Sequence, residues 1–525
     1  LAALALRLTP SGDPAGSLRA VEAARLAFRA GDTPGALDLL DGVDLMGAEP
    51  HVRFRHAGER ATIAYTIGVG DATVAAEDAL LWCTSDAERV EAEALLARVC
   101  YDDFPRAAEH AARAARLAEV VAVDPRVRAS VLVASGTTAF MAGRGLDHDA
   151  FRRAMDIETN LSIGAGESAF GSYAALLKMA DDIAASRVMF GQLVASTDDD
   201  GALPYALSHL PQLELWAGNW DAAEDCAHRH LAAAEAAAQP DQVSQARTNL
   251  ATINAHRGIL DEARALAVEV IERGVAIGDR WAERSGVGLL GFVDLSAGDA
   301  QAAVLHLDRW HALGEEMGIG DPGYCRLDGD HVEALVAVGR LDEAAERVDG
   351  MLAVARRLDR SRAVAVAERV GALVAAARHD HAQAEQSARR AVERLTAGPF
   401  VFERARAELT LGQTYRRLKQ RANARASLGD ALATFLALGA EAFAARARDE
   451  LARVGGRTDR FDQLTATERA VAERAGRGLT VKVIAAEMFI SPKTVEANLT
   501  RVYRKLAISG RAQLAHWLAG AAPVG

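Results

Sequence analysis

The sequence predicts an all-α protein: a long repeat of helical hairpins, followed by a small helical domain at the C-terminus. Three observations lead to this prediction. The chain has 525 residues, more than one hydrophobic core usually serves, with only 5% aromatic residues and 13 prolines. A glycine and alanine pattern recurs about every forty residues through its middle. After residue 454 this pattern stops and a basic segment with different helix signals begins.

The repeat is clearest in the second half of the body. Glycine stands at positions 218, 258, 298 and 339, and alanine follows five residues after each. We expect an apolar helix to end at each glycine with positive φ, aspartate three residues later to cap the next helix, and the alanine to let the two backbones approach closely. Weaker copies of the pattern start at His379, Lys419, Gly31, Gly70 and Gly145.

Such hairpins bury their apolar faces only by stacking on one another. Residues 1–454 are therefore expected to form an α-solenoid that resembles the tetratricopeptide-repeat proteins, with a somewhat longer period. Its concave groove would serve as a sensor or interaction surface for an unknown effector or protein partner. Residues 197–201 (TDDDG) are expected to be a solvated loop rather than a cation site.

Charge divides the chain unevenly. The formal net charge is −12, but residues 461–525 hold nine Lys or Arg and five Asp or Glu, so this segment is basic and the body acidic. The four cysteines are far apart and predict no disulfide, and the short apolar start, LAALALRL, fits neither a membrane span nor a signal peptide. We expect a cytoplasmic protein without membrane contact, in which the sequons at Asn160 and Asn498 are chance matches.

The C-terminal segment begins after a linker, residues 455–460, and extends over residues 461–525. Thr465 and Glu468 form the pattern of a capping box, so a first helix should start there and end near Ala475. Thr480 can cap a short second helix, and Ser491 followed by Pro492 is a strong signal for the start of a third. A fourth helix should run from Arg511 to Leu518, with Leu514 and Trp517 or Leu518 turned inward.

The third helix has two unlike faces. An apolar stripe at spacings of three and four residues should face the domain core: Val495, Leu499, Val502 and Leu506. The other face mixes small, polar and basic residues: Lys493, Glu496, Ala497, Thr500, Arg501 and Arg504. A short helix, a tight turn and a helix of this kind make a helix-turn-helix, whose last helix fits the major groove of DNA.

These residues resemble the LuxR-type helix-turn-helix regulators. The matching runs are LT…ER from Leu464, GLT…IA from Gly478, ISPKTVE from Ile490 and RVYRKL…SGR from Arg501. The resemblance implies that Lys493, Thr494, Asn498, Arg501 and Lys505 contact phosphates, that Glu496, Ala497 and Thr500 face base edges, and that the fourth helix forms a dimer contact on DNA. Arg504 is included in the expected DNA-binding face.

Two positions depart from the family pattern. Val483 stands where a Glu is usual, and Asn498 where a His is frequent. Neither departure removes a core position, so they concern the base preference rather than the fold. If Glu496 reads bases, its carboxylate should favour a cytosine amino group.

The layout of the whole chain resembles the large ATP-binding regulators of the LuxR family. No phosphate-binding loop occurs, because the sequence contains no Gly-Lys pair. Since the chain starts with Leu rather than Met, we expect any ATPase to be encoded upstream, and ATP is a cofactor only in that case. The chain itself is expected to have no enzymatic activity and to bind no cofactor or metal.

Other motifs have ordinary explanations. The GxGxxG run at 286–291 follows no strand, so its glycines should serve close helix packing rather than a dinucleotide. Cys226, His228 and His230, and the pair His379 and His381, lack further ligands for a metal.

The sequence therefore predicts a sequence-specific transcriptional regulator that binds double-stranded DNA and whose body senses an effector or partner. The alternative is an assembly scaffold with accessory, non-specific DNA binding.

Overall fold

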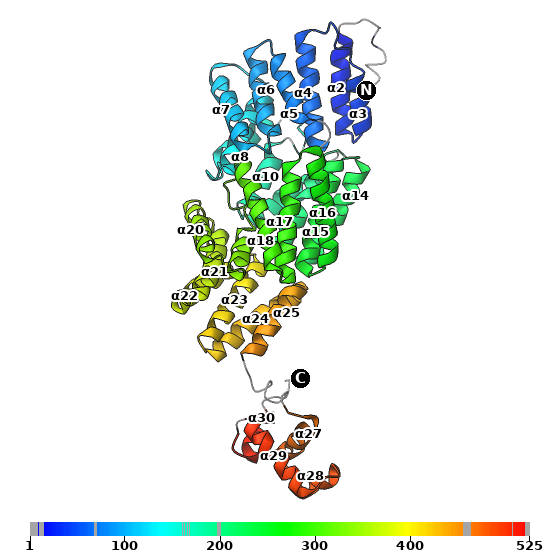
Figure 1. Ribbon diagram of the computed structural model, residues 1–525. Coiled ribbons are helices and arrows are strands. Elements are labelled where there is room, and N and C mark those ends of the chain that lie inside the picture. Colours follow the sequence, from blue (N-terminus) through cyan, green and yellow to red (C-terminus); the bar gives the residue numbers. More distant parts are fainter. Residues whose placement is uncertain are drawn as a thin grey trace.

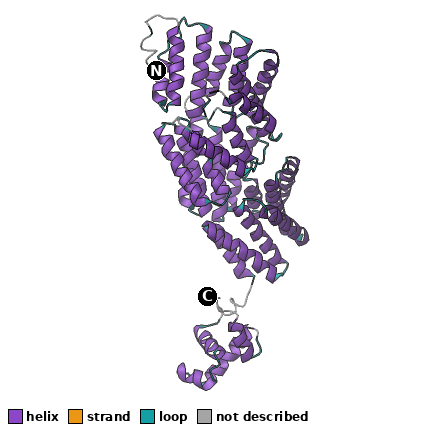
Figure 2. Cartoon of the chain, turned by 180° about the vertical axis from the view of Figure 1, so that it is seen from behind, coloured by secondary structure: helices purple, strands orange, loops and turns teal. Residues whose placement is uncertain are grey.

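The computed structural model describes residues 9, 15–67, 71–159, 161, 163, 164, 166, 168–196, 201–454, 464–506 and 508–519. In these residues every regular element is a helix, and Figure 2 shows helices joined by short loops. None of the described helices is both long and apolar enough to span a membrane. The linker 455–460, Gly70 and residues 197–200 lie outside the described residues.

The body is a succession of antiparallel helices, each packed on its neighbours in the chain (Figure 1). Its first part contains α2 (Ala15–Arg29), α3 (Thr33–Asp41), α4 (Pro50–Ile67), α5 (Ala72–Leu81), α6 (Asp86–Val99), α7 (Phe104–Val120), α8 (Pro125–Met141), α9 (His148–Glu158), α10 (Ala169–Met179), α11 (Ile183–Ser196), α12 (Leu203–Ser208) and α13 (Leu210–Trp216).

The second part is more regular. It contains α14 (Trp220–Ala236), α15 (Pro240–Arg257), α16 (Leu260–Ile277), α17 (Arg280–Ala297), α18 (Ala300–Glu316), α19 (Asp328–Ala337), α20 (Leu341–Arg357), α21 (Ser361–Ala377), α22 (His381–Thr396), α23 (Val401–Arg417), α24 (Arg421–Leu438) and α25 (Glu441–Arg453). The odd-numbered helices from α13 to α23 are the first helices of successive hairpins, and they also contact one another from hairpin to hairpin.

The predicted turns inside the hairpins are confirmed. Gly218, Gly258, Gly298 and Gly339 have φ between 83° and 89°, in the left-handed region. The weaker copies of the pattern adopt the same conformation without glycine, since His379 has φ 65° and Lys419 has φ 60°. The repeat therefore continues to the end of the body.

The alanines of the repeat are in the expected place. The side chains five residues after the turns are 0% exposed: Ala223, Ala263, Ala303, Ala344, Ala384 and Ala424. Each lies where the second helix of a hairpin meets its neighbours, so a methyl group there permits close packing of backbones.

The expected cap of the second helix is wrong. Asp221 and Asp261 lie in the first turns of α14 and α16, whose N-cap residues are Asn219 and Ile259 and have no side-chain cap bond. The chain re-enters a helix two residues after the glycine, so a position three residues later is already helical. The carboxylates there still lie beside the positive end of the helix dipole.

The GxGxxG run lies inside α17, as expected, and its glycines serve close contacts. A Cβ atom on Gly288 would lie 2.6 Å from the Trp310 ring, and one on Gly291 would lie 2.5 Å from Leu307 Cγ. Both partners belong to α18, which therefore packs against bare backbone on α17. No room remains on this face for a dinucleotide.

A separate group of four helices follows the body: α27 (Ala466–Gly476), α28 (Val481–Glu487), α29 (Pro492–Leu506) and α30 (Arg511–Ala519). Figure 1 shows them apart from the body, and their apolar side chains form a core of their own.

Candidate nucleic-acid interface

The start of α27 is fixed by the capping box that the sequence predicts. The Thr465 hydroxyl accepts a hydrogen bond from the Glu468 backbone N–H at 3.3 Å, and the Glu468 carboxylate accepts one from the Thr465 N–H at 2.8 Å. Two of the unpaired donors at the helix start are satisfied in this way. The helix ends at Gly476, one residue beyond the expected end.

A tight turn connects α28 to α29. Thr480 caps α28, and the chain reverses at Phe489, which has φ 54°. The Ile490 N–H donates to the Ala485 carbonyl at 3.0 Å, which closes the turn. Ser491 then caps α29, because its hydroxyl accepts from the Thr494 N–H at 3.1 Å, and Pro492 is the first helical residue. The helix-turn-helix geometry thus follows from local hydrogen bonds.

The predicted apolar stripe of α29 is buried. Val495, Leu499, Val502 and Leu506 belong to one cluster with residues of the other three helices, including Val471, Ile484 and Leu514. The inward position expected for Leu514 is confirmed, whereas the Trp517 side chain lies outside the described residues. This core fixes which face of α29 is turned to solvent.

That outer face carries most of the residues predicted to contact DNA. The exposed ones are Lys493, Thr494, Glu496, Ala497, Thr500, Arg501 and Arg504. Lys493, Arg501 and Arg504 join no ion pair among the described residues of this domain. Their charges are therefore available to an external anion, at the surface of a helix narrow enough for the major groove.

Asn498 lies on the other side of the helix. Its side chain is 5% exposed, and its amide nitrogen donates to the Thr494 carbonyl at 2.8 Å. A phosphate contact by this residue stays a prediction, and it would require the amide to leave its position on the helix backbone.

Lys505 is occupied by a carboxylate of the same domain. Its Nζ lies 2.6 Å from Glu468 Oε2, the oxygen that also accepts the bond from the Thr465 N–H. The hydrogen bond from Lys505 is the main cause of a lowered pKa for Glu468, with the backbone bond as a further cause. Sequence reasoning missed this pair, because the partners are 37 residues apart and follow no local spacing.

Two further features of this surface are absent from the sequence prediction. Arg474 of α27 pairs with Glu487 of α28 at 3.0 Å, which ties the first two helices together. Phe489 is 95% exposed at the turn, an unusual position for a large apolar side chain. An exposed residue at a turn gives no periodic signal, so the sequence alone could not place it.

The histidines considered as metal ligands in the sequence lie elsewhere, in the body. His230 is buried on α14, where its Nε2 lies 3.1 Å from Gln242 Oε1, and burial lowers its pKa to about 4. His379 and His381 flank the turn between α21 and α22, with their rings 6.2 Å apart.

Comparison with known proteins decides the nature of the C-terminal domain. Residues 462–518 match the family described as bacterial regulatory proteins, luxR family. These residues are a LuxR-type helix-turn-helix domain. The LuxR-type domain is 47% identical over 57 residues to the transcriptional regulatory protein UhpA of Salmonella typhimurium, a match that covers 11% of this chain and 29% of UhpA. An HTH-type transcriptional regulator of Mycobacterium bovis is 42% identical over 86 residues, which cover 16% of this chain and 9% of that protein.

The body that precedes the LuxR-type domain has a known fold. The crystal structure of a Rap protein, complexed with Competence and Sporulation Factor, aligns with 66% of this chain and 99% of its own length, at a TM-score of 0.50 and 13% sequence identity. The chain is thus an all-α protein in which a tetratricopeptide-like solenoid precedes a LuxR-type domain.

Proposed function

We propose that the chain is a transcriptional regulator that binds a specific sequence of double-stranded DNA through α29. The observation that carries this proposal is the outer face of α29, where three cations that pair with no described carboxylate surround small and polar side chains. The family match and the likeness to UhpA support it. The cations would hold the phosphate backbone, while Glu496, Ala497 and Thr500 would face base edges.

The orientation of α29 adds a second attraction for DNA. Pro492 and Lys493 lie at its N-terminus, where the positive end of the helix dipole and the Lys493 charge favour phosphate. We propose that two copies bind together, with α30 as the contact between them, as the resemblance to the family implies.

A selection from random duplex DNA with the full chain tests the proposal. We expect an enriched motif, and we expect Thr500→Ala to change the base preference at one position without abolishing binding. Thr467→Ala is the matched control, since Thr467 is an exposed threonine on α27, outside the predicted DNA face. Selection of no motif by the full chain would contradict specific binding and favour the scaffold alternative.

We further propose that the body controls the LuxR-type domain by binding an effector or a partner. In the Rap structure, a body of this fold is complexed with Competence and Sporulation Factor. In the present chain the support is a cavity of about 210 Å³ formed by α19, α21 and α23, the first helices of successive hairpins, together with α25. Charged side chains surround it, and the Glu333 carboxylate accepts hydrogen bonds from Arg369, Arg406 and Arg446 at 2.9, 2.9 and 3.1 Å.

The cavity can be blocked without disturbing its buried ion pairs. Asp449 is exposed and lines the cavity, so Asp449→Trp should fill it. Glu441→Trp on the same helix is the control, because Glu441 is an exposed acid outside the lining. DNA affinity of the full chain is measured with and without a small-molecule extract of cells. A response lost only in Asp449→Trp supports the assignment, whereas a response retained there contradicts it.

A further inference from the structure

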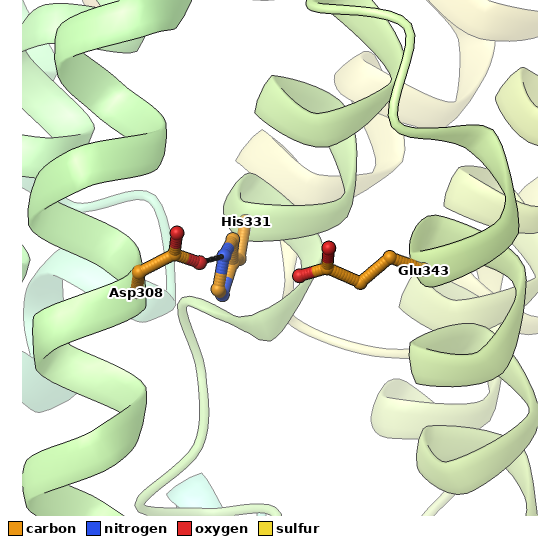
Figure 3. A group of neighbouring side chains, drawn as sticks. All are labelled: Asp308, His331 and Glu343. Carbon is orange, nitrogen blue, oxygen red and sulfur yellow. Dashed lines mark hydrogen bonds and ion pairs between the residues drawn. The ribbon is translucent and has the colours of Figure 1, made fainter.

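Three metal-ligating side chains meet where two hairpins of the body join. Asp308 belongs to α18, His331 to α19 and Glu343 to the first turn of α20. One donor atom from each lies within 4.8 Å of the other two. Figure 3 shows the His331 ring between the two carboxylates, which point toward it from opposite sides.

The imidazole of His331 is enclosed at this junction. Its side chain is 0% exposed. Its Nε2 lies 2.7 Å from Asp308 Oδ1, while Nδ1 has no hydrogen-bond partner among the described residues. A buried ring nitrogen without a partner is costly unless a cation or a donor satisfies it.

The two carboxylates face the ring from neighbouring helices. Asp308 accepts hydrogen bonds from Arg340 and His331 at 3.0 and 2.7 Å, and Glu343 accepts one from Arg340 at 2.6 Å. Asp308 and Glu343 are 39% and 38% exposed, so an ion could reach them from solvent and keep water ligands. The three side chains thus offer one nitrogen and two oxygen donors.

Arg340 is the cation that now neutralises this group in part. Its guanidinium lies 3.0 Å from Asp308 Oδ2 and 2.6 Å from Glu343 Oε2. The two carboxylates thus share one guanidinium. The Arg340 side chain is 42% exposed, so it can turn to solvent when a stronger cation arrives.

We propose that Asp308, His331 and Glu343 bind a divalent transition-metal ion, such as Zn²⁺, in exchange for Arg340. Imidazole favours such ions over Mg²⁺ and Ca²⁺, which prefer oxygen ligands alone. Ligand atoms about 2.0–2.2 Å from one ion are at most about 4.4 Å apart, so the carboxylates need to close by only a few tenths of an ångström. The ion would tie three helices of two hairpins together. This inference concerns the body alone and does not rest on the proposed DNA binding.

The test is a calorimetric titration of the full chain with ZnCl₂ after treatment with a chelator. We expect one site whose affinity falls at least tenfold in Glu343→Gln. Glu346→Gln is the matched control, because Glu346 is an exposed glutamate one turn further along α20. A titration with MgCl₂ should show no such site.

Arg340→Gln separates a metal site from a purely structural ion network. Removal of the competing guanidinium should tighten Zn²⁺ binding about fivefold or more, whereas Arg340 in a merely structural role would leave the affinity unchanged. The proposal is overturned if the unaltered chain shows no Zn²⁺ binding, if Glu343→Gln binds Zn²⁺ as the unaltered chain does, or if Arg340→Gln does not bind more tightly.

Discussion

Replacing Arg501 by glutamine should weaken the dependence of DNA binding on salt, and replacing Lys505 should do so far less. Arg501 is exposed on α29 without an ion-pair partner in the described part of the domain, whereas Lys505 is held by Glu468 at 2.6 Å. A cation that contacts a phosphate releases counterions, and its loss reduces the slope of log affinity against log salt by about 0.9.

The magnitude can be stated for a convenient salt range. Between 50 and 200 mM salt, a slope smaller by about 0.9 reduces the loss of affinity about 3.5-fold. For Arg501→Gln we expect this change on the selected site and on random duplex alike, because a phosphate contact carries no sequence information. For Lys505→Gln we expect a much smaller change in the slope than for Arg501→Gln, because Lys505 already forms an ion pair with Glu468 inside the domain.

Fluorescence anisotropy of labelled duplex with the full chain, at several salt concentrations, measures both slopes. Circular dichroism confirms that each variant is folded. An unchanged slope in Arg501→Gln, or equal slopes in the two variants, would refute the assignment of phosphate contacts drawn from the structure.

Three predictions concern the stability of the two parts. Gly291→Ala should lower the free energy of unfolding by about 1–2 kcal/mol, because overpacking against α18 outweighs the gain in helix propensity. Gly350→Ala, at an open position on α20, should raise the free energy of unfolding by up to about 1 kcal/mol. Urea denaturation that ranks the two variants in the opposite order would contradict the packing at Gly291. His379→Gly should stabilise the body by roughly 1 kcal/mol, since His379 has φ 65°, and an unchanged urea midpoint would show that the turn is not strained. The lowered pKa of Glu468 means that its stabilising effect is present above the ordinary carboxyl pKa and lost as pH falls through the lowered value. Melting temperatures from pH 7 to pH 3 should therefore fall more steeply for the unaltered chain than for Glu468→Gln, and parallel curves would argue against this role.

The parts of the fold that could be predicted are those with local causes. The turns at Gly258 and Gly298 depend on a few consecutive residues, and so do the capping box at Thr465 and the helix start at Pro492. The buried stripe of α29 follows from helical periodicity alone. The prediction that the repeat aspartates cap the second helices was wrong. The turn is shorter than the spacing suggested, so these aspartates already lie in the first turn of the helix.

The parts that could not be predicted depend on pairs distant in the sequence. Glu468 and Lys505 meet only because α27 packs across the end of α29, and Asp308, His331 and Glu343 meet only where two hairpins stack. For a residue at the boundary between the buried and exposed faces of a helix, the sequence also does not predict whether the side chain is buried or exposed. Asn498 shows this, since its polar side chain folds back on its own helix.

The left-handed turns also set how the body can change in length. The Gly258 and Gly298 turns are each closed by backbone bonds that reach back no more than five residues, as the bond from Ile259 N–H to the Asn254 carbonyl shows. Removing one whole hairpin would therefore connect two turns of the same conformation, and the chain would continue in the same direction. We expect the body to tolerate removal or addition of units of about forty residues, while the LuxR-type domain stays the same.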